Sequence, residues 1–251
     1  MSSPVLMFLP AHDEEATVGQ VVARAPRHVL GHPVVVAVVD DGSTDRTAEV
    51  ARRAGALVCS HGHNRGLGAA VRTGLALAGE LGAAAVAFLD ADGEYAPEEL
   101  ATLVGPIVAG EADYVVGSRF AGARRAMLPQ RWLGNRMLTL GVRAVARRWG
   151  VRGLTDGQSG YRALSAAAAA EAEVIHDFNY AQVLTFDLLA KGYRYAEVPI
   201  SYRFRQHGRS FVRLGPYLRH VVPAVRMELR SSSRLRSSSR RQPAPAVLGQ
   251  V

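Results

Sequence analysis

Three carboxylates follow an uninterrupted apolar run near the middle of the chain. Residues 86–89 are all apolar, and Asp90, Asp92 and Glu94 come directly after them, with Gly93 in between. Acids two residues apart supply hard oxygen ligands, which suit Mg²⁺ or Mn²⁺ shared with substrate phosphates. Chance acidic pairs in loops give the same D-x-D spacing, so this stretch by itself leaves a metal site and a solvated turn both open.

Polar side chains also recur where other apolar runs end. The runs that read as buried strands are residues 5–9, 34–39, 56–59, 86–89 and 113–117. The polar groups that follow them are Asp13-Glu14, Asp40-Asp41, Asn64-Arg65, Asp90-Asp92 and Ser118-Arg119. Because parallel strands end at one edge of a sheet, and ligands bind there, these groups are predicted to converge on a nucleotide site.

Helices are predicted between these strands. Residues 18–25 have helical spacing, and Pro97 suits a first helical position. Ser43 or Thr44 is placed to cap a helix that begins near Asp45. Alternating strands and helices indicate an α/β fold with a mostly parallel central sheet.

The alternation ends after Arg119. Helical patterns cover residues 129–150, 179–190 and 215–230, and residues 193–202 read as extended, with Pro199 indicating an edge strand. Residues 231–251 are rich in serine, arginine and proline, which is typical of a disordered basic tail. We therefore predict a main folded domain at 1–214, an amphipathic helix at 215–230 and a tail at 231–251.

Composition excludes several classes of protein. With 48% hydrophobic residues in 251, the chain is long and apolar enough to bury a core. Cys59 is the single cysteine, so a disulfide framework is excluded and a reducing compartment is expected. No basic leader precedes the first strand, and no apolar run reaches the roughly 20 residues that span a bilayer. We expect a cytoplasmic protein, with attachment to the inner face of the membrane left open.

The net charge of +8 implies anionic partners such as nucleotide phosphates, anionic lipid or nucleic acid. Lys191 is the only lysine among 30 basic residues, which leaves 29 arginines.

Several of these segments, in this order, resemble the inverting family 2 glycosyltransferases, and within them the polyprenyl- and dolichyl-phosphate sugar synthases. The segments are Leu-Pro-Ala-His-Asp-Glu-Glu from residue 9, Val-Asp-Asp-Gly-Ser-Thr-Asp from 39, Asn-Arg-Gly-Leu-Gly-Ala-Ala from 64, Asp-Ala-Asp-Gly-Glu from 90, Val-Gly-Ser-Arg from 116 and Ser-Gly-Tyr-Arg from 159. The resemblance covers about residues 5–215. It implies a GT-A fold, a nucleotide-diphosphate-sugar donor, a polyprenyl-phosphate acceptor and a divalent metal, Mg²⁺ or Mn²⁺.

The resemblance also implies roles for particular residues. The donor would be bound by Pro10, Ala11, Glu14, Asp40, Asp41, Asn64 and Asp90. The metal would be held by Asp90, Asp92 and Glu94, the last standing where relatives often carry glutamine. The catalytic residues would be Asp92, Arg119 and Arg162, with the two arginines near the donor and acceptor phosphates, since guanidinium stays charged and bonds phosphate bidentately.

A C-terminal segment of the family closes over the donor, and Arg205 and Ser210 match it. Relatives often continue with lysine where this chain has Phe211, so Arg209 or Arg213 would have to substitute for it.

The residues also allow other functions. The same fold would serve a soluble or protein hydroxyl acceptor, which requires a general base that an ionised phosphate does not. A non-catalytic nucleotide-binding module is a further alternative, against which the acidic trio argues. Glu94 weakens the match to phosphatases with a D-x-D-x-[TV] motif, and the glycine-rich turn lacks the Lys-Ser/Thr of a P-loop.

Structural roles are the competing reading for individual residues. Arg119 could form an ordinary ion pair, Arg205 could be solvated, and Asp156 could serve a turn as readily as contact a substrate. His12, His61 and His63 are interpreted as plain polar surface and left out of the site. We expect no nucleic-acid partner and infer no obligate protein partner.

Overall fold

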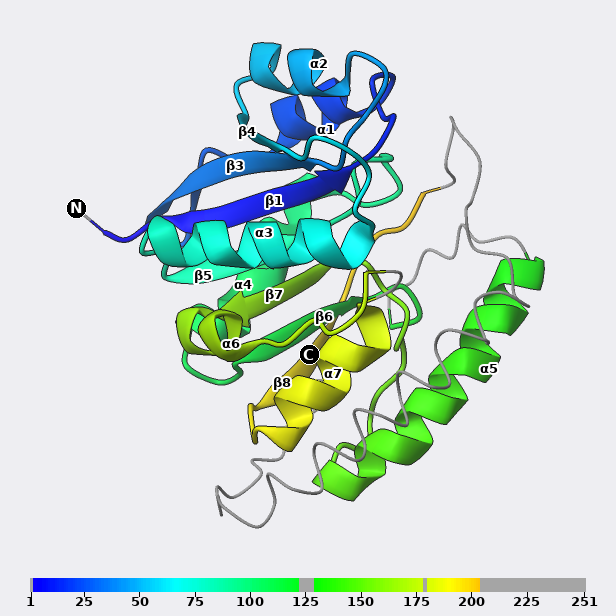
Figure 1. The fold of residues 1–251 in the computed structure, drawn as a ribbon. Coiled ribbons are helices and arrows are strands. Elements are labelled where there is room, and N and C mark those ends of the chain that lie inside the picture. Colours follow the sequence, from blue (N-terminus) through cyan, green and yellow to red (C-terminus); the bar gives the residue numbers. More distant parts are fainter. Residues whose placement is uncertain (1, 122–128, 178–179, 204–251) are drawn as a thin grey trace.

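The computed structural model describes residues 2–121, 129–177 and 180–203. Within them the chain forms an eight-stranded sheet with helices on both faces (Figure 1). The strands are β1 (Val5–Ala11), β2 (His28–Val29), β3 (His32–Asp40), β4 (Leu57–Ser60), β5 (Ala85–Phe88), β6 (Tyr114–Ser118), β7 (Arg162–Ser165) and β8 (Tyr195–Pro199). The helices are α1 (Val18–Arg24), α2 (Thr47–Arg53), α3 (Leu67–Glu80), α4 (Leu100–Val108), α5 (Pro129–Ala146), α6 (Ala166–Glu171) and α7 (Ala181–Ala190), with short 3₁₀ turns η1 (Pro97–Glu99) and η2 (Arg147–Trp149).

The sheet is mostly parallel, as predicted. Its strand order is β2-β3-β1-β5-β7-β6-β8, and β4 also pairs with β3. The pairs β1–β3, β1–β5, β3–β4 and β6–β8 are parallel, whereas β7 runs antiparallel to both β5 and β6. Consequently β1, β3, β5 and β6 all end at one edge, which confirms the predicted convergence of their polar termini. The short strands β2 and β7 are not predicted by the sequence patterns.

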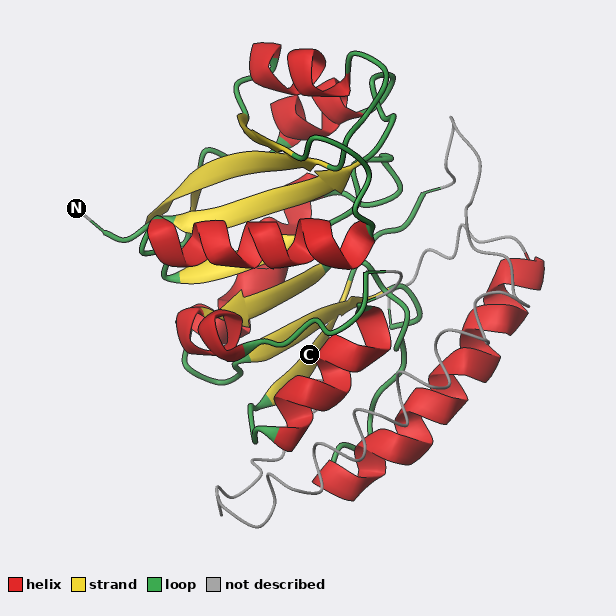
Figure 2. Cartoon of the chain, in the orientation of Figure 1, coloured by secondary structure: helices red, strands yellow, loops and turns green. Residues whose placement is uncertain are grey.

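Figure 2 shows helices on either side of the strands, and two apolar layers fill the space between sheet and helices. One layer contains the buried faces of α1, α2 and α4, and the other contains those of α3, α6 and α7. Every residue of β1 is buried, because this strand lies between β3 and β5 and is covered on both faces. α3 packs very closely on it: a Cβ at Gly74 would lie 2.4 Å from the Phe8 ring. Deep central strands of this kind hold the polar strand ends in fixed positions.

Local predictions have mixed outcomes. Pro97 does open η1, and β8 with Pro199 is an edge strand, as expected. The predicted cap of the second helix is wrong. α2 begins at Thr47, whose N–H donates to Asp45 Oδ1 at 2.9 Å. Ser43 and Thr44 instead serve the first loop, where the Asp13 N–H donates to Ser43 Oγ at 3.0 Å and the Thr44 N–H to Asp13 Oδ1 at 2.7 Å.

None of the helices in the described part of the chain is both long enough and apolar enough to cross a membrane. The predicted helix at 215–230 and tail at 231–251 lie outside the described residues.

Candidate functional site

The predicted donor-binding residues of β1 and β3 lie at the carboxyl edge of the sheet. Pro10 and Ala11 end β1 and are buried, while Glu14 is half-buried in the loop that follows. Asp40 ends β3, where its carboxylate accepts the Ser43 N–H at 3.0 Å. Pro10, Ala11 and Asp40 thus lie side by side at the ends of two adjacent parallel strands.

Asp41 ties two loops together through its carboxylate. Its Oδ1 accepts from His61 Nδ1 at 2.6 Å and from the Arg65 N–H at 2.9 Å. Its Oδ2 accepts the Gly66 N–H at 2.8 Å, which Asn64 Oδ1 shares at 3.0 Å. Asp41 therefore shapes the loop that leads from β4 into α3, whereas the side chain of Asn64 is exposed.

The interpretation of His61 as plain polar surface is wrong. Its side chain is only 7% exposed, and Nε2 lies 2.9 Å from Thr73 Oγ1 on α3 while Nδ1 faces Asp41. The imidazole thus connects β3 to α3 beneath the loop. The signal that could have found it is its position directly after the strand Leu57–Ser60, at the same edge as the other polar groups.

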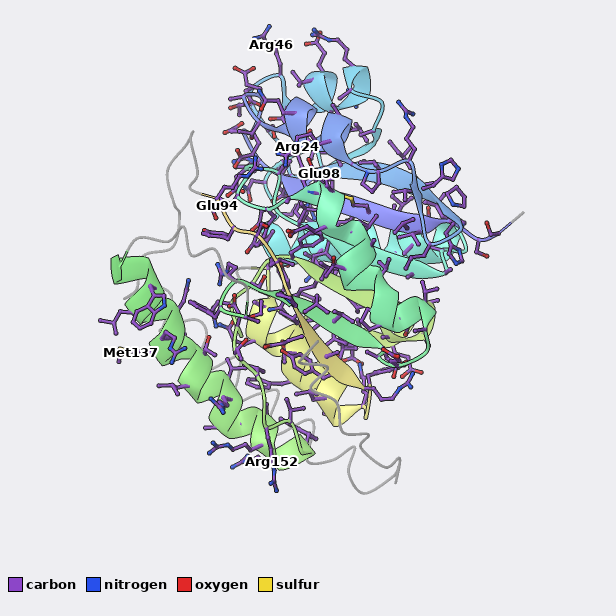
Figure 3. All side chains as sticks on the ribbon, turned by 180° about the vertical axis from the view of Figure 1, so that it is seen from behind. Arg24, Arg46, Glu94, Glu98, Met137 and Arg152 are labelled. Atoms are coloured by element: carbon purple, nitrogen blue, oxygen red, sulfur yellow. The ribbon has the colours of Figure 1, made fainter. Side chains whose placement is uncertain are left out.

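The acidic loop after β5 is built differently from the prediction. Asp92 and Glu94 are both buried, and Asp92 Oδ1 accepts the Glu94 N–H at 3.0 Å. The Glu94 carboxylate accepts from the Tyr202 hydroxyl at 2.6 Å. Across the described residues, no group of three or more His, Cys, Asp or Glu is arranged to hold a metal ion. Asp90, Asp92 and Glu94 therefore do not form such a group in this structure, and one oxygen of the Glu94 carboxylate accepts from Tyr202 (Glu94 is labelled in Figure 3).

Asp90 and Asp92 both lie in the loop that follows β5, at the carboxyl edge of the sheet. The backbone before β7 lies directly against Asp90, since a Cβ at Gly160 would be 2.5 Å from Asp90 Oδ2. Two carboxylates are the number that Mg²⁺ commonly takes from a protein when substrate phosphates and water supply its other ligands. The two aspartates therefore fit a metal that is shared with a diphosphate.

Arg119 is held in a buried ion pair with Asp156. Nε donates to Asp156 Oδ2 at 2.7 Å, and Nη2 donates to Oδ1 at 2.9 Å. The Arg119 side chain is 7% exposed and that of Asp156 is wholly buried. Burial acts to lower the pKa of the guanidinium, but neighbouring Tyr95 and Asp156 outweigh it, so the pKa lies well above its usual value. Arg119 thus stays cationic in a fixed orientation.

One aromatic ring joins Arg119 to the acidic loop. The Arg119 guanidinium carbon lies 5.2 Å from the centre of the Tyr202 ring, whose hydroxyl binds Glu94. The Arg203 N–H also donates to the Glu94 carbonyl oxygen at 2.9 Å. The cation and the acidic loop therefore share one site, and the chain that follows β8 fastens them to each other. Tyr202 is the residue here that the sequence did not single out, and Asp156, left open between a turn and a substrate contact, is the ion-pair partner of Arg119.

Arg162 does not reach this site. It begins β7, it is fully buried, and its guanidinium lies over the rings of Tyr114 and Tyr180. Its donors bind Ser159 O, Tyr114 OH, Ala181 O, Thr185 Oγ1 and Gly157 O. The structure contradicts its predicted contact with the acceptor phosphate, because the interior of the protein already engages the guanidinium. Arg205, Ser210 and the alternatives to a lysine at Phe211 lie outside the described residues.

Comparisons with known proteins agree with this geometry. The family model described as glycosyl transferase family 2 matches residues 7–165. An uncharacterised protein of Methanocaldococcus jannaschii is 33% identical over 82% of this chain and 84% of its own length. The UDP-N-acetylglucosamine–dolichyl-phosphate N-acetylglucosaminyltransferase of Methanococcus voltae is 31% identical over 65% of this chain and 70% of its own. The undecaprenyl-phosphate mannosyltransferase of Micrococcus luteus is 31% identical over 90% of this chain and 94% of its own.

The fold has a clear counterpart among solved structures. Glucosyl-3-phosphoglycerate synthase from Mycobacterium tuberculosis, crystallised with Mn²⁺, uridine diphosphate and glucosyl-3-phosphoglycerate, superposes with a TM-score of 0.71 at 24% identity. The match covers 90% of this chain and 80% of that one. It shows a shared GT-A fold. With the family model matching well over half of its length, the chain belongs to glycosyltransferase family 2.

Proposed function

We propose that this enzyme transfers a sugar from a nucleotide-diphosphate-sugar to a polyprenyl phosphate, with inversion at the anomeric carbon. One observation carries the proposal: Tyr202 joins a fixed, buried arginine, Arg119, to Glu94 of the acidic loop that follows β5. A cation and a metal-binding acid pair suit a reaction with a phosphate on both partners. The names of the M. voltae and M. luteus relatives, both of them lipid-phosphate glycosyltransferases, favour a lipid-linked acceptor.

The transfer itself is a single displacement. An oxygen of the acceptor phosphate attacks the anomeric carbon from the face opposite the donor diphosphate. The bond from that carbon to the diphosphate oxygen breaks, and its electron pair leaves with the nucleoside diphosphate. A phosphate monoester is already ionised near neutral pH, so no strong general base is required.

Each group at the edge has a proposed part in this step. Pro10, Ala11 and Asp40 form the wall against which the nucleoside lies. Asp90 and Asp92 would hold Mg²⁺ or Mn²⁺, which when bound neutralises charge on the departing diphosphate. Arg119 offers a permanent positive charge to a phosphate oxygen, and Asp156 holds its plane.

A donor and acceptor panel tests the proposal. The full chain is incubated with individual nucleotide-diphosphate-sugars, Mg²⁺ or Mn²⁺, and one of three acceptors: a polyprenyl phosphate, the matching neutral polyprenol, or a soluble sugar alcohol. We expect transfer only to the polyprenyl phosphate. Equal use of the neutral polyprenol or the sugar alcohol would overturn the phosphate acceptor and favour the hydroxyl-acceptor enzyme.

Access to such an acceptor calls for a surface that meets the membrane, and we propose that α5 supplies it. Figure 1 shows this 18-residue helix standing apart from the sheet. Leu133, Met137 and Leu140, one helical turn apart, are 56%, 66% and 61% exposed, and Figure 3 shows Met137 on the side away from the sheet. No acid occurs between Asp113 and Asp156, while Arg136, Arg147, Arg148 and Arg152 are exposed. A basic helix with an apolar stripe matches an anionic lipid surface.

Replacing Leu133, Met137 and Leu140 together by serine is expected to lower binding to anionic vesicles at least tenfold, since each buried apolar side chain contributes on the order of 1.5–3 kcal/mol. Wild-type binding is expected to fall as salt rises, because each arginine near the surface contributes about 1 kcal/mol. Co-sedimentation with phosphatidylserine-containing vesicles measures both.

Leu30→Ser with Leu57→Ser is the matched control, since these exposed leucines lie on other elements. We expect this control variant to bind vesicles like wild type. Truncation of the wild-type chain after Arg230 is expected to weaken vesicle binding. If the wild-type chain stays in the supernatant at low salt, the proposal that α5 binds a lipid surface is wrong.

A further inference from the structure

A half-buried glutamate on the edge strand β8 binds the loop that carries Asp156, the partner of Arg119. Glu197 faces Val116 in the parallel pairing of β6 and β8. Its Oε1 and Oε2 accept the Thr155 N–H at 2.9 and 2.8 Å, and Oε2 accepts the Thr155 hydroxyl at 2.5 Å. Its Oε1 also accepts the Asp156 N–H at 3.1 Å and the Tyr195 hydroxyl at 2.6 Å.

Such a carboxylate needs an explanation. Taking a charge out of water is expensive unless hydrogen bonds replace the lost hydration, and an apolar residue would fill the same space at lower cost. Burial raises the pKa of the Glu197 carboxyl, while the bonds from Thr155, Tyr195 and Asp156 act to lower it. Three of the four donor groups belong to Thr155 and Asp156. The carboxylate therefore mainly fixes the backbone of the loop that contains these two residues.

That loop sets the position of Arg119 in two ways. Asp156 uses both carboxylate oxygens on the guanidinium and also accepts the Arg119 N–H at 3.1 Å. The Thr155 hydroxyl lies 2.6 Å from Ser118 Oγ, one residue before Arg119. A shift of the Thr155–Asp156 backbone would therefore move the two-point contact that fixes the guanidinium plane.

We infer that Glu197 is a positioning residue for sugar transfer, which acts on Arg119 through Thr155 and Asp156. The inference rests on the role proposed for Arg119. Glu197 touches no reacting group: it lies within β8, opposite Val116 and two pairs before the end of β6. Its contribution is the orientation of a cation that meets the substrate.

Glu197→Gln tests this directly. The substituted amide keeps one acceptor oxygen but turns an NH₂ toward backbone N–H groups, so the loop must shift. We expect kcat/KM to fall about 10- to 100-fold, the range found when the group that orients a functional side chain is removed. Thr155→Val, which removes a hydroxyl that bonds both Glu197 and Ser118, is a milder second variant and is expected to shift kcat/KM in the same direction.

Asp113→Asn is the matched control. Asp113 comes directly before the first residue of β6, and Arg194 comes directly before β8. Arg194 Nε donates to Asp113 Oδ2 at 2.8 Å. It therefore ties the same two strands together at the edge away from the site. We expect this variant to keep kcat/KM within about twofold of wild type even where the melting temperature falls.

A double-mutant cycle separates positioning from general destabilisation. If Glu197 acts through Arg119, then Glu197→Gln introduced into an Arg119→Ala background should lower kcat/KM by less than about a further twofold. The same additional loss in both backgrounds would overturn the inference, as would an Arg119→Ala variant with wild-type activity or a Glu197→Gln effect no larger than that of Asp113→Asn.

The double-mutant cycle is measured with two activities: hydrolysis of the nucleotide-diphosphate-sugar without acceptor, and transfer of the sugar to the acceptor. If the wild-type chain hydrolyses the donor but does not glycosylate polyprenyl phosphate, the proposed acceptor is wrong. The cycle on donor turnover would still decide the role of Glu197.

Discussion

Asp92→Asn is expected to abolish sugar transfer almost completely while leaving the fold intact. The substituted amide retains an oxygen that can accept the Glu94 N–H, so the turn after β5 survives. The negative charge is lost, and with it a proposed ligand for the metal that would neutralise charge on the leaving diphosphate. A loss on the order of 10²-fold or more in kcat follows from removing one preorganised electrostatic contact of this kind. Steady-state transfer with Mg²⁺ or Mn²⁺, together with thermal unfolding, measures both halves of the prediction.

Glu94→Gln is the informative control. Its amide oxygen can still accept from the Tyr202 hydroxyl, which binds Glu94 at 2.6 Å. If the metal is held by Asp90 and Asp92, this variant should lose far less activity than Asp92→Asn. Equal losses would restore the three-carboxylate cluster, and full activity of wild type and Asp92→Asn in EDTA would contradict the metal-dependent step.

Arg162→Ala is expected to lower the free energy of unfolding by about 3–5 kcal/mol, because it opens a cavity and leaves buried acceptors without a donor. Those acceptors include Tyr114 OH, Thr185 Oγ1 and the Ala181 carbonyl oxygen. Urea denaturation monitored by circular dichroism measures the change.

Arg194→Ala gives the comparison for this prediction. Arg194 pairs with Asp113 in a partly exposed setting, where such pairs contribute about 0–1 kcal/mol. A stable Arg162→Ala protein with a raised KM for the lipid phosphate alone would instead return Arg162 to the acceptor site.

Much of the fold follows from local patterns. The runs at 5–9 and 86–89 are apolar without interruption because both faces of β1 and β5 are covered, and burial of that kind is visible in the sequence itself. The acids that follow these runs, Asp13 and Asp90, are also visible in the sequence, because an apolar run gives way to polar residues where the strand leaves the core. The edge of the site was therefore predictable from residue order.

The partners across that edge were not predictable. Glu94 meets Tyr202 from 108 residues away, and Arg119 meets Asp156 from 37 away, so no spacing rule connects them. The role of Arg162 was predicted wrongly because a sequence motif gives the type of a residue but not the direction in which its side chain points. Its position at the start of β7 sends the guanidinium into the core. His61 was missed because polarity alone does not reveal a buried contact with Asp41.

The reversed direction of β7 has a consequence for how the protein can vary. Parallel strands contribute to the working edge only through the loops that leave them. β7 runs the other way, so the segment that enters it, with Asp156 and Gly160, arrives at that same edge. Insertions or deletions just before Arg162 would therefore remodel the site, whereas changes of equal length after Ser165 would fall on the opposite rim. Exchanging the segment at 151–161 between relatives should therefore change the site directly, because it carries Asp156 and Gly160.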